Sequence, residues 1–361
     1  MSVEIWPSLP PEQLITAIDQ TQTRELQWLL NELHDTLQSL KHGLEDCYAL
    51  LAPIDPGSTL VVSTHRNETV KGHITRVGTR IVKGTLTLKM KTQPPQTYAI
   101  NPDNPIQLAP LAHLHALLTE SIDLLTLTTQ YTYTPPTSTS TTTTTTTTTP
   151  PTPSSPPPSP AHSSTATFIA AQLRLLSQSL AEASSLLRGP QPLTASDATW
   201  VSRSCSPDHF RPRPGAGLSL HWGVQESQLV LWLRALEPAA APVNLGLKLA
   251  LAIGTARRLE HDEAEQVFIY TYPEGAVPPP ETAADGSGQQ RGGSRENNNS
   301  SGGGGGGRDE IEAQVFVREK VRVESADPAL MSLGTKLTAL ATTLSLARGN
   351  LAVVMGEDPE W

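Results

Sequence analysis

The chain has 361 residues, two cysteines and a formal net charge of −9. A balance this acidic argues against a general nucleic-acid binder, which would present a basic face. The opening residues, MSVEIWPSLPPEQ, lack the basic start and apolar run of a signal peptide. No stretch reaches the roughly 18 consecutive apolar residues of a membrane-spanning helix. We therefore expect a cytoplasmic protein whose thiols are free.

Two segments have compositions that are typical of disorder. Residues 134–165 consist almost entirely of Thr, Ser and Pro, and residues 275–309 of Gly, Ser, Asn, Gln and charged residues. Neither segment offers enough apolar surface to offset the entropy lost when a chain becomes ordered. We predict a disordered linker at 134–165 and a disordered insertion at 275–309.

The first strong signal is a helix at 24–52 whose apolar residues follow heptad spacing. The seam consists of Leu26, Leu30, Leu33, Leu37, Leu40, Leu44, Cys47 and Leu51. Charged residues lie off this seam, as solvated positions should, and Pro53 stops the helix. A seam sustained for more than three heptads predicts a long helix with one buried side.

Three further segments repeat the pattern of apolar residues at helical spacing. They are residues 106–131, 166–188 and 328–355. Asp327-Pro328 opens the last of them with a capping residue and a proline in the first turn. Because apolar seams must be buried, the simplest arrangement packs all four helices into one antiparallel bundle.

Between these helices the hydrophobic period changes to two. Short β-branched segments, separated by Gly, Pro or Asn, predict a small antiparallel meander. Its strands are residues 59–63, 68–77, 80–90 and 96–100. A second β-rich region follows the third helix, with strands at 217–223, 228–236, 244–253, 264–272 and 312–324. The segment 275–309 then becomes a long hairpin insertion between the last two strands.

The sequence thus predicts an α+β fold with two domains, each discontinuous in sequence. One is an antiparallel four-helix bundle with leucine-heptad seams, and the other is a separate antiparallel β domain. The bundle takes residues 11–53, 106–132, 166–189 and 327–356, and the β domain takes residues 58–101 and 217–324.

Catalytic and ligand-binding motifs are missing from the sequence. It contains no phosphate loop, dinucleotide fingerprint, nucleophile elbow, CxxC or HExxH. His113 and His115 lie two apart on a helix and so cannot easily share a metal. Cys47 lies on the seam, which favours a core position over a nucleophile. We predict no catalytic, cofactor-binding or metal-binding residues, and a protein that is not an enzyme.

Two other groups of residues have structural interpretations. His261, Asp262 and Glu263 form a polar turn that would need further ligands to hold a metal. Trp28 lies next to the first seam, while Trp222 and Trp232 lie in predicted strands, so we expect all three to pack in the core.

Four short stretches, in order along the chain, resemble the Rogdi family. They are Glu25 to Leu30 (ELQWLL) followed by Leu33-His34; Val70-Lys71-Gly72 followed by Leu86 to Met90 (LTLKM); Leu229 to Leu236 (LVLWLRAL); and Lys320 to Glu324 (KVRVE) before Asp327-Pro328. The chain departs from the family in the threonine tract, in the glycine insert and in residues 190–215.

The resemblance implies a non-catalytic adaptor. Fungal members of the family are the second subunit of the RAVE complex, which promotes reassembly of the vacuolar proton-pumping ATPase from its cytosolic and membrane sectors. The implied partners are a large WD-repeat scaffold subunit, the Skp adaptor and the peripheral sector of the ATPase, with no nucleic acid and no cofactor. The implied location is the cytoplasm, with peripheral recruitment to vacuolar or endosomal membranes and no membrane insertion.

Two alternatives remain open at this stage. A generic coiled-coil scaffold or tethering protein of membrane traffic would carry similar seams, although isolated zippers associate with another chain whereas four seams can satisfy one another. An unrecognised enzyme would need a deep pocket with several ionisable groups.

Overall fold

The computed structural model describes residues 10–133, 160–190, 196–239, 261–272 and 311–356. The chain divides into two compact units. The helical unit comprises Met1–Ala52, Ala109–Arg188 and Pro328–Trp361, and the sheet unit comprises Pro53–Leu108 and Gly189–Asp327.

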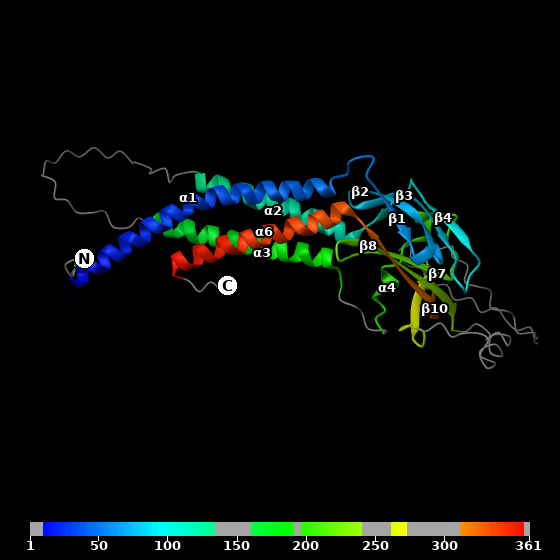
Figure 1. The fold of residues 1–361 in the computed structure, drawn as a ribbon. Coiled ribbons are helices and arrows are strands. Elements are labelled where there is room, and N and C mark those ends of the chain that lie inside the picture. Colours follow the sequence, from blue (N-terminus) through cyan, green and yellow to red (C-terminus); the bar gives the residue numbers. More distant parts are fainter. Residues whose placement is uncertain (1–9, 134–159, 191–195, 240–260, 273–310, 357–361) are drawn as a thin grey trace, which may run out of the picture. The chain divides into compact units, whose positions relative to one another are not determined.

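Four long helices pack together in the helical unit (Figure 1). They are α1 (Pro11–Leu51), α2 (Ala109–Tyr133), α3 (Pro160–Arg188) and α6 (Pro328–Met355). α1 packs against α2 and α6, and α3 packs against the same two helices. The heptad seam of α1 is buried at Leu29, Leu33, Leu37, Leu40, Leu44, Cys47 and Leu51. Each fully buried leucine contributes about 1.5–3 kcal/mol, so these seams hold the unit together.

One close approach fixes how α1 meets α6. A Cβ atom added at Gly43 would lie 2.5 Å from Cδ2 of Leu340. A side chain at this position would require Leu340 to move, because its Cδ2 atom occupies that space. The glycine therefore costs some helix propensity but lets the two helices interlock.

α1 begins at Pro11, as the predicted bundle segment does, and so extends beyond the leucine pattern that begins at residue 24, because residues without a leucine seam can still be helical and proline suits a first turn. Two helix ends differ from the prediction. α2 begins at Ala109, since residues 106–107 form strand β5. α3 begins at Pro160, inside the segment predicted to be disordered. The rest of that segment, the insertion 275–309 and the predicted strand 244–253 lie outside the described residues.

By length and composition alone, α6 could cross a membrane, and it is the one described helix that could. Its seam leucines, among them Leu330, Leu333 and Leu337, are fully buried in the helical unit. The seam side of α6 is thus buried, while only 22% of its most apolar 18-residue window is buried.

The first sheet begins with the predicted meander. Its strands are β1 (Ser58–Ser63), β2 (Val70–Val77), β3 (Arg80–Leu88), β4 (Gln96–Ile100) and β6 (Phe210–Arg211), in that order, with β5 (Ile106–Gln107) paired to β3. All these pairs are antiparallel. The β2–β3 turn contains Gly78 at a φ of 60°, which glycine adopts at no steric cost. The predicted meander is confirmed for β1 to β4. The pairing of β4 with β6 was not predicted, because it joins segments that are far apart in the chain.

The second sheet has the strand order β7-β8-β10-β9. Its strands are β7 (Leu218–Gln225), β8 (Gln228–Pro238), β9 (Val267–Tyr272) and β10 (Ile311–Ala326). β9 and β10 flank the insertion and pair antiparallel, as the predicted hairpin requires.

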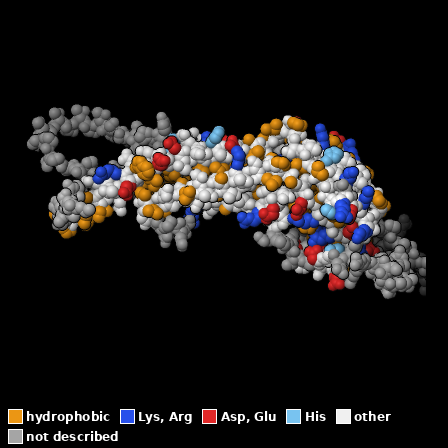
Figure 2. All heavy atoms as spheres, in the orientation of Figure 1, with side chains coloured by type: hydrophobic (Ala, Val, Ile, Leu, Met, Phe, Trp, Pro, Cys, Tyr) orange, Lys and Arg blue, Asp and Glu red, His pale blue; other side chains and the backbone are white. Residues whose placement is uncertain are grey.

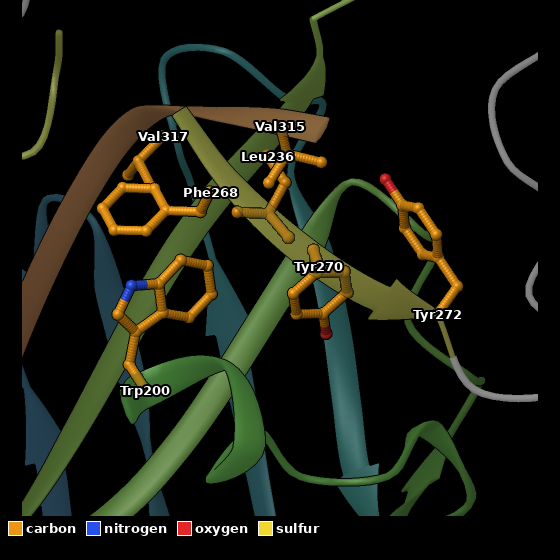
Figure 3. Packing of buried hydrophobic residues seen from close by; sticks show 7 residues of the cluster. All are labelled: Trp200, Leu236, Phe268, Tyr270, Tyr272, Val315 and Val317. Carbon is orange, nitrogen blue, oxygen red and sulfur yellow. The ribbon is translucent and has the colours of Figure 1, made fainter. Parts of the chain in front are cut away.

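A short helix, α4 (Thr199–Ser202), contributes Trp200 to an aromatic cluster on the second sheet. Figure 3 shows Trp200, Phe268 and Tyr270 turned toward one another. The ring of Trp200 lies 5.3 Å from that of Phe268 at a T-shaped angle and 5.9 Å from that of Tyr270. Such aromatic pairs add about 0.5–1.5 kcal/mol each beyond the area they bury.

The predicted fold class, an antiparallel four-helix bundle with one separate β domain, is wrong. The described residues form five helices and two antiparallel sheets, which is a mixed α+β fold. The leucine seams indicate which side of each helix is buried, but seam spacing does not encode how many layers the chain builds. It also could not reveal α4 or the division of the strands into two sheets, because both depend on contacts between distant residues.

Candidate protein-binding surface

The first turns of α1 carry apolar side chains that the protein leaves exposed. Leu14, Ile15 and Ile18 are 48%, 61% and 48% exposed, and Trp28 is 66% exposed. Figure 2 shows hydrophobic side chains at the surface where α1 begins. We call Leu14, Ile15, Ile18 and Trp28 the α1 stripe. Large apolar side chains that gather on one exposed helix segment mark an interaction site more often than scattered ones do.

The α1 stripe lies close to the line of the buried seam. Ile15, Ile18, Gln22 and Leu26 precede Leu29 at spacings of three and four residues, which keeps them on one side of a helix. Leu29 is buried, Leu26 is half-buried, and Ile15 and Ile18 are exposed. The seam therefore continues beyond the part of α1 that the other helices cover.

An open hollow of about 250 Å³ lies on this segment, lined by Ala17, Ile18, Thr21 and Gln22. It is smaller than the pockets that hold metabolites and cofactors.

The charges beside the α1 stripe are mostly negative. Between residues 11 and 28 the carboxylates are Glu12, Asp19 and Glu25, and the one cation is Arg24. All four side chains are exposed. Flanking charges of this kind set the choice of partner in helix pairing, so the segment suits a helix with basic flanks.

Trp28 corrects the prediction that this residue packs in the core. It lies one position before Leu29, and it is Leu29 that is buried. Before Leu33, the buried side of α1 therefore differs from the predicted seam, because Leu26 and Leu30 are only half-buried. Of the other two tryptophans, Trp222 is buried, as predicted, while Trp232 is half-buried.

The two histidines of α2 contact different helices. His113 Nε2 lies 3.4 Å from Glu182 Oε1 on α3, and both side chains are about half exposed. The ring of His115 lies 4.6 Å from that of Tyr48 on α1. The structure therefore places the two imidazoles apart, as their spacing along the helix predicts. No group of three possible metal ligands occurs among the described residues.

Both cysteines have environments that suppress thiolate formation. Cys47 is buried on the α1 seam, and this burial raises the pKa of its thiol to about 11. Burial also raises the pKa of Cys205 to about 12. Because the thiolate is the reactive form, neither side chain is suited to nucleophilic attack near neutral pH.

The polar turn at 261–263 holds a buried ion pair that the sequence did not predict. Arg234 donates to Glu263 through Nε at 2.7 Å and Nη2 at 2.9 Å, and Lys320 Nζ lies 2.7 Å from the same carboxylate. Burial acts to raise the pKa of Glu263, but the hydrogen bonds from Arg234 and Lys320 outweigh it, so the pKa is lowered. A carboxylate already held by two cations is a structural group rather than a metal ligand.

Arg234 also joins this ion pair to the aromatic cluster. Its Cζ atom lies 4.5 Å from the ring centre of Trp200 and 5.8 Å from that of Trp232. The two hydrogen bonds to the carboxylate of Glu263 and the contact with the ring of Trp200 require a planar guanidinium, which lysine lacks. The ion pair joins β8 to the turn before β9 across 29 residues of sequence, so no local sequence pattern predicts it.

These features define a class of protein: a mixed α+β chain with heptad-seamed helices, whose most distinctive described surface is an exposed helical stripe. The family model described as Rogdi leucine zipper containing protein matches residues 25–352, and the chain belongs to this family. No curated protein matches the chain.

Proposed function

We propose that the chain is a non-catalytic adaptor subunit that promotes reassembly of the vacuolar proton-pumping ATPase from its cytosolic and membrane sectors. Membership of the Rogdi family supports this proposal. The observation that carries the binding role is the α1 stripe, where Ile15 and Ile18 extend a buried seam into solvent.

The α1 stripe suits a partner that contributes an amphipathic helix. Such a helix would continue the packing of α1 and bury the stripe, with one apolar side chain in the hollow at Ala17 and Thr21. Its flanks would be basic, opposite Glu12, Asp19 and Glu25. We assign this helix to the large WD-repeat scaffold subunit of the RAVE complex, with the Skp adaptor and the peripheral sector of the ATPase as further members of the assembly.

An adaptor of this kind acts without chemistry of its own. By holding the scaffold and the peripheral sector together, it raises their effective concentration and so speeds reassembly. Its place would be the cytoplasm, with peripheral recruitment to vacuolar or endosomal membranes and no membrane insertion.

Affinity purification of the tagged full-length chain, followed by mass spectrometry, tests the proposal. The purification is carried out from cells with and without glucose starvation, a treatment chosen to separate the two ATPase sectors. Recovery of the WD-repeat scaffold and peripheral ATPase subunits is the expected result. Recovery of the chain alone, or with unrelated proteins of membrane traffic, would contradict the proposal and favour a tethering role.

A further inference from the structure

The solvent face of the β1–β4 sheet combines cations with hydroxyl groups. Side chains alternate between the two faces of each strand, and the inner face is buried, as at Ile74 and Leu86. Three rows of residues cross the outer face: Ser63, Lys71, Thr87 and Thr97; Val61, His73, Thr85, Ala99 and Arg211; and Thr59, Thr75 and Lys83. None of these residues is Asp or Glu, and all are exposed or half-buried. We call this set the threonine face.

The charge of this region is opposite to that of the whole chain. Residues 53–108 contain seven Lys or Arg against three Asp or Glu, a net charge of +4, whereas the complete chain has −9. Among the described residues, no carboxylate lies within ion-pair distance of Lys71 or Lys83. Arg211 is paired, with Nη2 lying 2.6 Å from Asp103 Oδ2. Two lysines of the threonine face are thus available to an acidic ligand.

The hydroxyl groups of the threonine face are held in place by cross-strand pairing. Thr59 and Thr75 are joined by a hydrogen bond of 3.2 Å between their hydroxyls, and Thr87 and Thr97 by one of 3.1 Å. β2 and β3, which carry Thr75 and Thr87, are paired on both sides, and β1, which carries Thr59, is the edge strand. Donors fixed in this way bind an anion at a small cost in conformational entropy.

We propose that the threonine face binds an extended acidic segment of a partner protein. Lys83 lies opposite Thr75, which is four residues from Lys71 along β2. At a rise of about 3.3 Å per residue, the two lysines are separated by roughly 13 Å along the strand direction. Carboxylates four residues apart on one side of an extended chain have the same separation. Thr85 and His73 lie between the lysines and can donate to groups of that chain.

A protein ligand fits the threonine face better than a nucleic acid or a membrane does. The face has no Phe, Tyr or Trp, the side chains that form the stacking platforms of single-strand binders. Val61 is the one large hydrophobic residue exposed on it, at 70%, and stable attachment to a bilayer needs a second signal besides a few cations. Carboxylates, in contrast, match both the ammonium groups and the hydroxyl donors of the face.

Fluorescence anisotropy with a labelled synthetic peptide tests this proposal in the full-length chain. The probe has Glu at every fourth position and Ser elsewhere, and the alternative ligand is a vesicle of phosphatidylcholine and phosphatidylserine. We expect the peptide to bind at low salt, and the double variant Lys71→Glu/Lys83→Glu to bind at least tenfold more weakly. Thr85→Val, which keeps the shape and removes the hydroxyl, should weaken binding several-fold.

The matched control changes the same amount of charge on the helical unit. In Arg174→Glu/Arg188→Glu both arginines are exposed on α3, and we expect peptide binding within twofold of the parent chain. A thermal melt of each variant establishes that it is folded. Failure of the peptide to bind, equal loss in the control variant, or binding to vesicles without binding to the peptide would each overturn the proposal.

Discussion

Arg76 and Asp327 form a buried ion pair that joins the second strand to the residue before the last helix. Nε of Arg76 lies 2.5 Å from Oδ2 of Asp327, and the side chains are 3% and 0% exposed. Nη1 of Arg76 also donates to the carbonyl oxygen of Gly78. The pair fixes the end of β10 against the β2–β3 turn, although the two residues are 251 positions apart in the chain.

Replacing the arginine should destabilise the sheet unit strongly. Arg76→Leu leaves the carboxylate of Asp327 buried without its cation, and the loss of one partner of such a pair costs about 3–5 kcal/mol. Urea unfolding followed by circular dichroism measures the change in the free energy of unfolding.

The double variant separates the charge from the packing. In Arg76→Leu/Asp327→Asn the uncompensated charge is gone, so part of the lost stability should return. A double variant as unstable as the sum of both single variants would show that the two side chains act independently.

Glu263 predicts a pH dependence of stability. Its pKa in the folded protein is lowered from the ordinary value of 4.5. A lowered folded-state pKa gives a contribution that is fully present above about pH 4.5 and is lost as the pH falls through the folded-state value. Thermal melts between pH 3 and 7 should therefore show a steeper acid decline for the parent chain than for Glu263→Gln.

The glutamine variant should also be less stable at pH 7, since Arg234 and Lys320 lose a charged partner. Identical acid declines for the parent chain and for Glu263→Gln would show that this carboxylate does not contribute to the acid transition.

The thiols should react slowly in the folded protein. With pKa values raised to about 11 for Cys47 and about 12 for Cys205, very little thiolate is present at pH 8. We expect slow labelling by Ellman's reagent in the native state and rapid labelling of both thiols in guanidinium. Fast native labelling that disappears in Cys205→Ser would contradict the raised pKa of that thiol.

The seam of α1 and the α1 stripe should respond differently to substitution. Leu37 is fully buried, so Leu37→Ala should cost about 2–5 kcal/mol, and Leu37→Asp should unfold the helical unit because it buries a charge. Ile15→Ala, at a position that is 61% exposed, should change stability by less than about 0.5 kcal/mol. Chemical denaturation of both alanine variants makes the comparison, and equal costs would contradict the exposed position of Ile15.

Local patterns predicted the elements of this fold better than their assembly. Heptad spacing at Leu33, Leu37 and Leu40 indicated a buried helix side, and the alternation in Gln228 to Leu236 indicated a strand, since both depend on neighbours in sequence. The predicted bundle with one β domain failed because the layer arrangement is set by long-range pairs such as β4 with β6.

The candidate surfaces were harder to predict than the elements. The same apolar spacing runs through Ile18 and Leu33, yet one is exposed and the other buried, because burial depends on where the neighbouring helices lie. The threonine face likewise needs the strand register, which brings Lys71 and Lys83 to one side of the sheet. The composition of the whole chain is acidic, so it does not reveal that residues 53–108 carry a net positive charge.

Capture of the WD-repeat scaffold by stripe variants tests the central proposal, that the chain is an adaptor and binds its partner through the α1 stripe. The tagged parent chain, Ile15→Asp/Ile18→Asp and the control Leu346→Asp/Val353→Asp are each purified from cytosol. The control changes two α6 residues that are each 66% exposed. We predict that the parent chain and the control recover the scaffold and that the stripe variant, folded by circular dichroism, loses at least nine-tenths of it. Undiminished recovery by the stripe variant would contradict the account.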